Sequence, residues 1–132
     1  MQLMTKEIEK KASKFPMYSQ DEKGLDAEII VKFFDPTSNW TWYATEYDPE
    51  NKIFMGYVSG FENEFGSFSL TELESVKGRF GLGIERDRHF ENKKVRDIPH
   101  HHLPSYLEKE LLEEPDEDDM EYQFKSPDLF KM

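Results

Sequence analysis

Two alternating runs of residues separated by a short turn signal constrain the fold of this chain most strongly. The runs Trp-Thr-Trp-Tyr-Ala-Thr-Glu-Tyr and Lys-Ile-Phe-Met-Gly-Tyr-Val-Ser-Gly-Phe cover residues 40–47 and 52–61. Both are rich in the aromatic and β-branched residues that favour strands, and the Asp-Pro-Glu-Asn sequence between them is typical of a turn. The pattern predicts a β-hairpin in which Tyr47 pairs with Lys52.

Alternation along residues 40–47 divides the side chains between two faces of the predicted sheet. Successive side chains of a strand point in opposite directions. One face is expected to carry Trp40, Trp42, Ala44 and Glu46, and the other Thr41, Tyr43, Thr45 and Tyr47. One face must pack on the helices and bury its rings, because aromatic side chains dominate the energetics of small cores. The rings of the other face are either packed as well, which we favour, or open to a base, a sugar or a partner protein.

Capping patterns predict the helices. Thr5 precedes an amphipathic pattern over residues 4–15 and is the expected N-cap of the first helix. Ser69 and Glu72 form a capping-box pattern that begins a second helix over residues 69–78. A third, short helix over residues 105–114 has the same pattern in Ser105 and Glu108.

The remaining strands complete an α+β fold. Strands are expected at residues 27–34, 65–68 and 84–90, and the last is placed at a sheet edge because its middle is charged. The prediction is an antiparallel sheet of four to five strands with two packed helices, forming one domain over residues 1–91. A linker over residues 92–104 and an acidic C-terminal helical tail over residues 105–132 are expected to follow.

Charge is concentrated in this tail. The formal net charge is −11, and residues 97–132 contain 11 acidic and 3 basic residues. Such a surface repels phosphate backbones, which disfavours direct nucleic-acid binding. The tail can instead solubilise the chain or bind a basic surface of a partner protein, including a surface that normally holds nucleic acid.

The composition also indicates a compartment. The chain has no cysteine, its N-terminal region is interrupted by lysines, and no apolar run approaches the ~20 residues that span a bilayer. We therefore expect a cytoplasmic protein without a disulfide framework, a membrane segment or a cofactor.

Three segments together resemble a known family. They are Val-Lys-Phe-Phe-Asp-Pro-Thr-Ser-Asn-Trp-Thr-Trp-Tyr-Ala-Thr-Glu-Tyr-Asp, Phe-Gly-Ser-Phe-Ser-Leu-Thr-Glu-Leu-Glu and Gly-Leu-Gly-Ile-Glu-Arg-Asp-Arg-His-Phe. In this order they are similar to the domain of unknown function 2958, found in small bacterial, phage and plasmid proteins. The resemblance covers roughly residues 4–91, although members often have proline at the position of Gly83. It implies carriage on mobile genetic elements and supplies no activity or site residues.

Two clusters are candidates for chemistry. Glu85, Asp87 and His89 share one face of the last strand, where two carboxylates and an imidazole can serve acid–base catalysis or hold a metal. The same spacing is typical of ordinary cross-strand ion pairs, which we favour. The run His100, His101 and His102 is a weak metal candidate, since consecutive histidines point in different directions. No metal is expected.

The composition and the resemblance together favour a non-enzymatic protein-binding factor of a phage or plasmid. Its most concrete form is an anti-defence protein that inhibits or modulates a host defence or nucleic-acid-handling complex. A first alternative is an aromatic stacking module for a nucleotide, single-stranded nucleic acid or glycan, centred on Trp40 and Trp42. A second is a small hydrolase that uses the 85–89 cluster. The expected partner contacts are Tyr43, Tyr47, Arg86, Arg88, Glu113, Glu114, Asp116, Glu117, Asp118 and Asp119.

Overall fold

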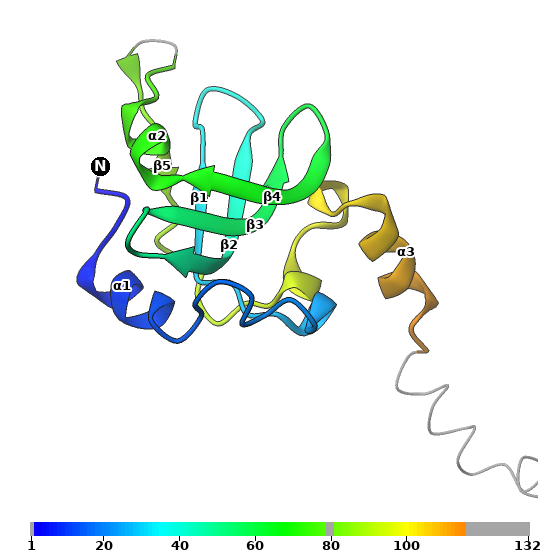
Figure 1. The fold of residues 1–132 in the computed structure, drawn as a ribbon. Helices are drawn as coiled ribbons and strands as arrows, with labels where there is room; N and C mark the ends of the chain where they lie inside the picture. Colours follow the sequence, from blue (N-terminus) through cyan, green and yellow to red (C-terminus); the bar gives the residue numbers. More distant parts are fainter. Residues whose placement is uncertain (1, 79–80, 116–132) are drawn as a thin grey trace, which may run out of the picture.

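The structure, a computed structural model, describes residues 2–78 and 81–115. It confirms an α+β fold built on one five-stranded antiparallel sheet (Figure 1). The elements in chain order are α1 (Lys6–Ala12), η1 (Gly24–Asp26), β1 (Val31–Phe34), β2 (Thr41–Asp48), β3 (Ile53–Ser59), β4 (Asn63–Ser69), α2 (Leu70–Ser75), β5 (Glu85–Arg86), η3 (Val95–Asp97), η4 (His100–His102) and α3 (Ser105–Glu113).

The strand order in the sheet is β4-β3-β2-β1-β5, so β4 and β5 form its two edges. The expected hairpin of β2 and β3 is present. Its register differs from the prediction, since Tyr47 pairs with Phe54 and Asp48 with Ile53. The Asp48 carboxylate accepts hydrogen bonds from the backbone N–H groups of Glu50 and Asn51, which keeps Lys52 within the turn.

A β-bulge in β2 changes which residues share a face. The register shifts between Ala44 and Glu46, which leaves Thr45 as the extra residue. Its carbonyl accepts a hydrogen bond of 2.6 Å from the Gln20 side chain. Beyond the bulge the alternation restarts, so Tyr47 joins the face of Ala44 while Tyr43 lies on the opposite face. The predicted grouping of Tyr43 with Tyr47 is therefore wrong.

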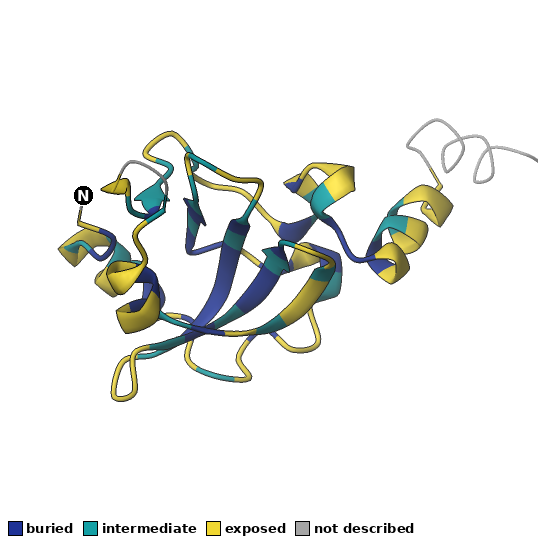
Figure 2. Cartoon of the chain, turned by 90° about the horizontal axis from the view of Figure 1, so that it is seen from above, coloured by how far each residue is buried: buried dark blue, intermediate teal, exposed yellow. Residues whose placement is uncertain are grey.

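Both faces of the sheet are covered, as the buried strands in Figure 2 show. The first core lies with α1 and α2. The second core lies beside η1, η3 and α3, on the other side of the sheet. The buried members of the first core are Leu3, Met4, Ala12, Phe15, Ile30, Val31, Phe33, Ala44, Tyr47, Phe54, Phe68, Leu70, Leu73 and Ile84. Those of the second are Leu25, Ala27, Ile29, Tyr43, Tyr57, Val95, Ile98, Leu103 and Leu107.

The second core draws on residues 92–104, which the sequence suggests as a linker. Val95, Ile98 and Leu103 are buried in it, and Leu107 of α3 extends it. The segment contains two short 3₁₀ turns, η3 and η4, which bring these apolar side chains to the sheet. The apolar residues therefore do not recur with the spacing of a helix or a strand. Most of the acidic tail lies outside the described residues.

Two of the three predicted helix caps are present. Thr5 accepts a hydrogen bond from the Ile8 backbone N–H, and Ser69 accepts one from that of Glu72. The third prediction is wrong, since Ser105 is the first residue of α3 rather than its N-cap. The carbonyl of Pro104 accepts the backbone N–H groups of Leu107 and Glu108, so these amides are satisfied without a side chain.

Candidate functional site: an aromatic rim at one end of the sheet

The site begins with two loops at the same end of the sheet. Residues 35–40 connect β1 to β2, and residues 60–62 connect β3 to β4 (Figure 1). Together with η4 they border an open cavity of about 720 Å³, within the size range of sites for small ligands or partner side chains. Its lining combines aromatic rings with short polar side chains: Lys32, Phe34, Asp35, Ser38, Asn39, Trp40, Thr41, Ser59, Gly60, Phe61, Glu62, Asn63, His101 and His102.

The first loop holds Trp40 in place by local hydrogen bonds. Asp35 accepts hydrogen bonds from the backbone N–H and the hydroxyl of Thr37, both 2.8 Å long. These bonds, led by the backbone one, lower the pKa of the Asp35 carboxyl below its usual value. The backbone N–H of Asp35 reaches the Trp40 carbonyl, and the Trp40 N–H donates to Ser38 Oγ. The position of the Trp40 backbone is thus set by the Asp-Pro-Thr-Ser turn.

Phe61 is the most exposed aromatic residue beside this cavity. Its side chain is 93% exposed, at the turn between β3 and β4. The Trp40 ring lies 5.2 Å away in an edge-to-face arrangement and stacks on Trp42 at 5.9 Å. A Cβ added to Gly60 would lie 2.4 Å from the Trp40 ring, so only glycine permits this approach. We call Trp40, Trp42 and Phe61 the aromatic rim.

A hydrogen bond from buried Tyr43 holds His102, which lines the cavity. Tyr43 Oη lies 2.7 Å from His102 Nδ1. Burial, then the charge of Asp87, raises the pKa of Tyr43, so the hydroxyl keeps its proton. Burial lowers the pKa of His102, and His101 and Lys32 lower it further. The pair is therefore neutral near pH 7, and it positions η4 against β2.

Asn63 fastens the same end of the sheet to η4. Its amide nitrogen donates to the carbonyls of His101 at 2.7 Å and Leu103 at 3.2 Å. Its amide oxygen accepts a 2.7 Å hydrogen bond from the Ser59 hydroxyl. Because Asn63 begins β4 and Ser59 ends β3, this network fixes the base of the turn that carries Phe61.

The sequence prediction missed Phe61. It placed this residue at the end of the strand over residues 52–61, whereas β3 ends at Ser59. The signal that marks it is Ser-Gly-Phe-Glu-Asn, in which small and turn-forming residues surround an aromatic one. The predicted stacking residues Trp40 and Trp42 belong to the site, but they are only partly exposed and stack on each other.

The two tyrosines predicted as partner contacts are buried. Tyr43 has no exposed surface and Tyr47 is 7% exposed. Burial is the first cause that raises the pKa of Tyr47, followed by the charges of Glu9, Asp48 and Glu74. In this structure both rings therefore serve packing, one in each core.

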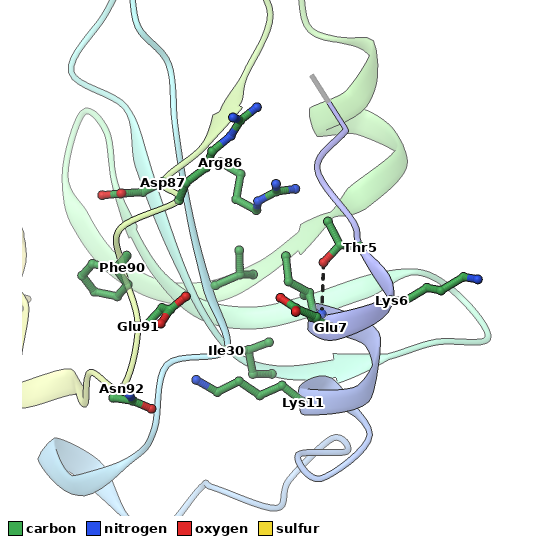
Figure 3. A pocket seen from close by; sticks show the side chains of 13 residues that line it. Thr5, Lys6, Glu7, Lys11, Ile30, Arg86, Asp87, Phe90, Glu91 and Asn92 are labelled. Carbon is green, nitrogen blue, oxygen red and sulfur yellow. Dashed lines mark hydrogen bonds between the residues drawn. The ribbon is translucent and has the colours of Figure 1, made fainter.

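Arg86 and Arg88 line a different cavity, of about 610 Å³, between α1 and the segment that follows β5 (Figure 3). Arg86 donates a hydrogen bond to the Gln2 carbonyl. Glu7, Lys11 and Glu91 extend toward the gap, while Lys6 points away from it. Groups of both signs thus surround an apolar floor that includes Ile30, with no single charge that would select a ligand.

The catalytic candidates do not converge on a cavity. Glu85 lies on β5 opposite Phe34. The Asp87 carboxylate forms an ion pair of 3.4 Å with Lys32 and accepts the backbone N–H of His89. The His89 side chain itself is exposed. Asp87 therefore holds the edge of the sheet to β1, in agreement with the cross-strand interpretation.

The histidine run divides into different environments. His100 is exposed, while the rings of His101 and His102 lie 4.2 Å apart beside the cavity. Within residues 2–78 and 81–115 no group of three or more His, Cys, Asp or Glu side chains is placed to hold a metal ion.

Two of the predicted acidic contacts lie at the end of α3. Glu114 binds Arg96 at 2.9 Å, and Arg96 also binds Asp26 at 2.7 Å. Glu113 lies 4.0 Å from Lys109. The acids Asp116, Glu117, Asp118 and Asp119 lie outside the described residues. In the part of the chain that is described, no helix has the length and apolarity needed to cross a membrane.

Comparison with protein families agrees with the three sequence segments. The model described as protein of unknown function (DUF2958) matches residues 3–100. The chain belongs to the DUF2958 family. The match to DUF2958 extends through η3 and into η4, so it includes Val95 and Ile98 of the second core. No match was found among curated proteins or among solved structures.

Proposed function

We propose that this DUF2958 protein is a non-enzymatic protein-binding factor and that Phe61 is its anchor. The observation that carries the proposal is a phenylalanine that is 93% exposed on a turn whose base is fixed by Asn63. Exposure of an apolar ring of this size to water is unfavourable. Burial in a partner would contribute roughly 1.5–3 kcal/mol.

The surroundings of Phe61 fit the anatomy of a binding anchor. Residues that dominate binding energy are commonly aromatic and sit at the centre of a packed patch. Trp40 and Trp42 form a stacked support behind Phe61, so less side-chain freedom remains to be lost on binding. The neighbouring cavity, which is lined by His102 and Asn63, can receive a side chain of the partner.

Charge narrows the class of partner. Glu62 and Glu64 are exposed beside Phe61, and the whole chain has a net charge of −11. The complementary surface is an apolar pocket with a basic rim, since opposite potentials steer two proteins together. Basic surfaces of this kind are common on proteins that handle nucleic acid. An inhibitor or modulator of a host defence or nucleic-acid-handling complex is the concrete form of this proposal.

The experiment compares two substitutions of exposed apolar residues. Phe61→Ser removes the anchor, and Leu112→Ser on α3 is the matched control, because Leu112 is 69% exposed and lies away from the cavity. Each protein is used to capture partners from an extract of the cell that carries its gene, with quantification by mass spectrometry. We expect Phe61→Ser to lose specific partners that wild type and Leu112→Ser retain. Equal capture by all three would overturn the proposal.

A further inference from the structure

The sheet has one long edge that nothing in the described residues pairs with. β4 ends the strand order and comprises seven residues, Asn63–Ser69. An open edge presents backbone N–H and C=O groups to any strand that approaches. This edge begins two residues after Phe61, so it lies beside the proposed anchor.

The hydrogen bonds of the hairpin show which backbone groups face outward. At one end of the ladder Gly60 N–H donates to the Glu62 carbonyl, and at the other Leu70 N–H donates to the Lys52 carbonyl. In an antiparallel ladder hydrogen-bonded pairs alternate with pairs that are not. The pairs of Phe65 with Tyr57 and of Ser67 with Met55 are therefore of the second kind. Phe65 and Ser67 direct their N–H and C=O groups away from β3.

This edge has few of the devices that usually block strand addition. Protected edges are short, or carry charged residues, proline or a bulge. β4 has seven residues without proline, lysine or a bulge, and Glu64 is its one charged residue. The opposite edge differs, since β5 has two residues and Arg86 on it is bound to the Gln2 carbonyl. Among the described residues, the β4 edge is thus the longer and less protected of the two edges.

The side chains along β4 indicate what kind of strand would fit. Phe65 is 41% exposed and packs on Tyr57 at a ring distance of 5.1 Å. A Cβ added to Gly66 would meet nothing within 4 Å, which leaves room for a large side chain of a neighbouring strand to cover the glycine. The exposed carboxylate of Glu64 suits a basic side chain beside it.

We propose that the β4 edge binds an extended, basic segment of the partner protein, which joins the sheet as a sixth strand. The proposal rests on the proposed protein-binding function and specifies how the partner is held. Hydrogen bonds to Phe65 and Ser67 supply affinity. Side chains at three successive positions, basic beside Glu64 and aromatic or β-branched over Phe65 and Gly66, supply specificity.

The test selects ligands from a randomised display library of ten-residue peptides, using the full chain. The selected peptides are then synthesised and their affinities measured for wild type, Ser67→Pro and Ser67→Ala. Proline at position 67 removes the outward N–H and leaves the bonds to β3, which involve residues 66 and 68, in place. Alanine keeps the N–H and is the matched control. Hydrogen exchange of the amides of residues 66 and 68 shows that the ladder is intact.

We expect enriched peptides in which a basic residue is next to two successive aromatic or β-branched residues. Their affinity should fall about tenfold in Ser67→Pro, the loss expected for a strong backbone hydrogen bond, and stay unchanged in Ser67→Ala. No enrichment over a protein-free control would overturn the proposal, as would equal binding by all three proteins. A concentration-dependent dimer that Ser67→Pro abolishes would also overturn it, because the edge would then belong to a second copy.

The variants Phe61→Ser and Ser67→Pro distinguish failure of the strand-addition proposal from failure of the proposed protein-binding function. If partner capture from the cell extract is lost with Phe61→Ser but retained with Ser67→Pro, the protein-binding function stands and strand addition is wrong. If neither substitution changes capture, both proposals fall.

Discussion

Phe54 and Phe61 lie seven residues apart in one hairpin, yet they occupy opposite environments. Phe54 is fully buried among Phe33, Tyr47 and Phe68, whereas Phe61 is 93% exposed. The first belongs to the aromatic centre of the sheet and the second to the aromatic rim. The comparison teaches that aromatic content by itself does not indicate a binding surface. Rings at the centre of the sheet, such as Phe54, are core, because both faces of the sheet are covered there.

The largest difference between the two regions should appear in stability. Phe54→Ala removes a ring that makes three aromatic contacts in the first core. We expect it to lower the free energy of unfolding by about 3–5 kcal/mol, the usual cost of such a cavity. Chemical denaturation measures the effect. A loss below about 1 kcal/mol would contradict the assignment of this ring to the core.

Substitution of a glycine by alanine should affect stability differently at the centre of the sheet and at its β4 edge. In Gly56→Ala the new Cβ would lie 1.9 Å from the Tyr43 carbonyl oxygen, so the two central strands must move apart. We expect a loss of at least about 1–3 kcal/mol, as for overpacked cores. Gly66→Ala is the matched control on β4, where the added Cβ meets nothing within 4 Å. Equal unfolding midpoints for the two variants would refute the close approach of β2 and β3.

Local signals in the sequence predict much of this architecture. The caps at Thr5 and Ser69 act through hydrogen bonds to residues three positions away, so their patterns are readable from the chain itself. The alternation of residues 40–47 and 52–61 indicates the central hairpin for the same reason. The charged strand at the β5 edge follows from the need to protect a sheet edge.

Other features depend on residues that are distant in the sequence. The bulge at Thr45 is stabilised by Gln20, whose side chain donates to the Thr45 carbonyl. Val95, Ile98 and Leu103 reach the second core through 3₁₀ turns, which give no regular apolar period. The apolar run continues through Phe61 and so predicts a strand there, although the backbone leaves β3 at Ser59.

The hydrogen bond between Tyr43 and His102 leads us to expect a moderate dependence of the free energy of unfolding on pH. Because burial, together with His101 and Lys32, lowers the pKa of folded His102, the unfolded chain binds a proton at higher pH than the folded chain. Stability is therefore fully present above the unfolded value, near 6.5, and falls as pH decreases from there toward the folded pKa. The protonated ring could no longer accept the Tyr43 hydroxyl proton at Nδ1.

The measurement is the free energy of unfolding between pH 7.5 and about 5.5, roughly one unit on either side of the usual histidine pKa. We expect His102→Gln to reduce the loss of stability on acidification. His89→Gln is the control, since the His89 side chain is exposed. If both variants retain the wild-type slope, His102 is not the group that titrates.

The smallest expected change in stability is at the aromatic rim. Phe61→Ser removes a ring that packs on Trp40 by its edge and is otherwise in water. We expect the free energy of unfolding to change by no more than about 0.5 kcal/mol, as for surface substitutions in general. Thermal unfolding of the variant beside Phe54→Ala checks this difference. A loss as large as that of Phe54→Ala would show that Phe61 is a structural residue.

The most direct measurement of the central claim places a photo-reactive phenylalanine analogue at position 61 of the full chain, inside the cell that carries its gene. The same analogue at position 112 of α3 serves as the control. If Phe61 anchors a partner, irradiation will link position 61 to a discrete protein that position 112 does not reach. Absence of an adduct at position 61, or the same adducts at both positions, would contradict the account.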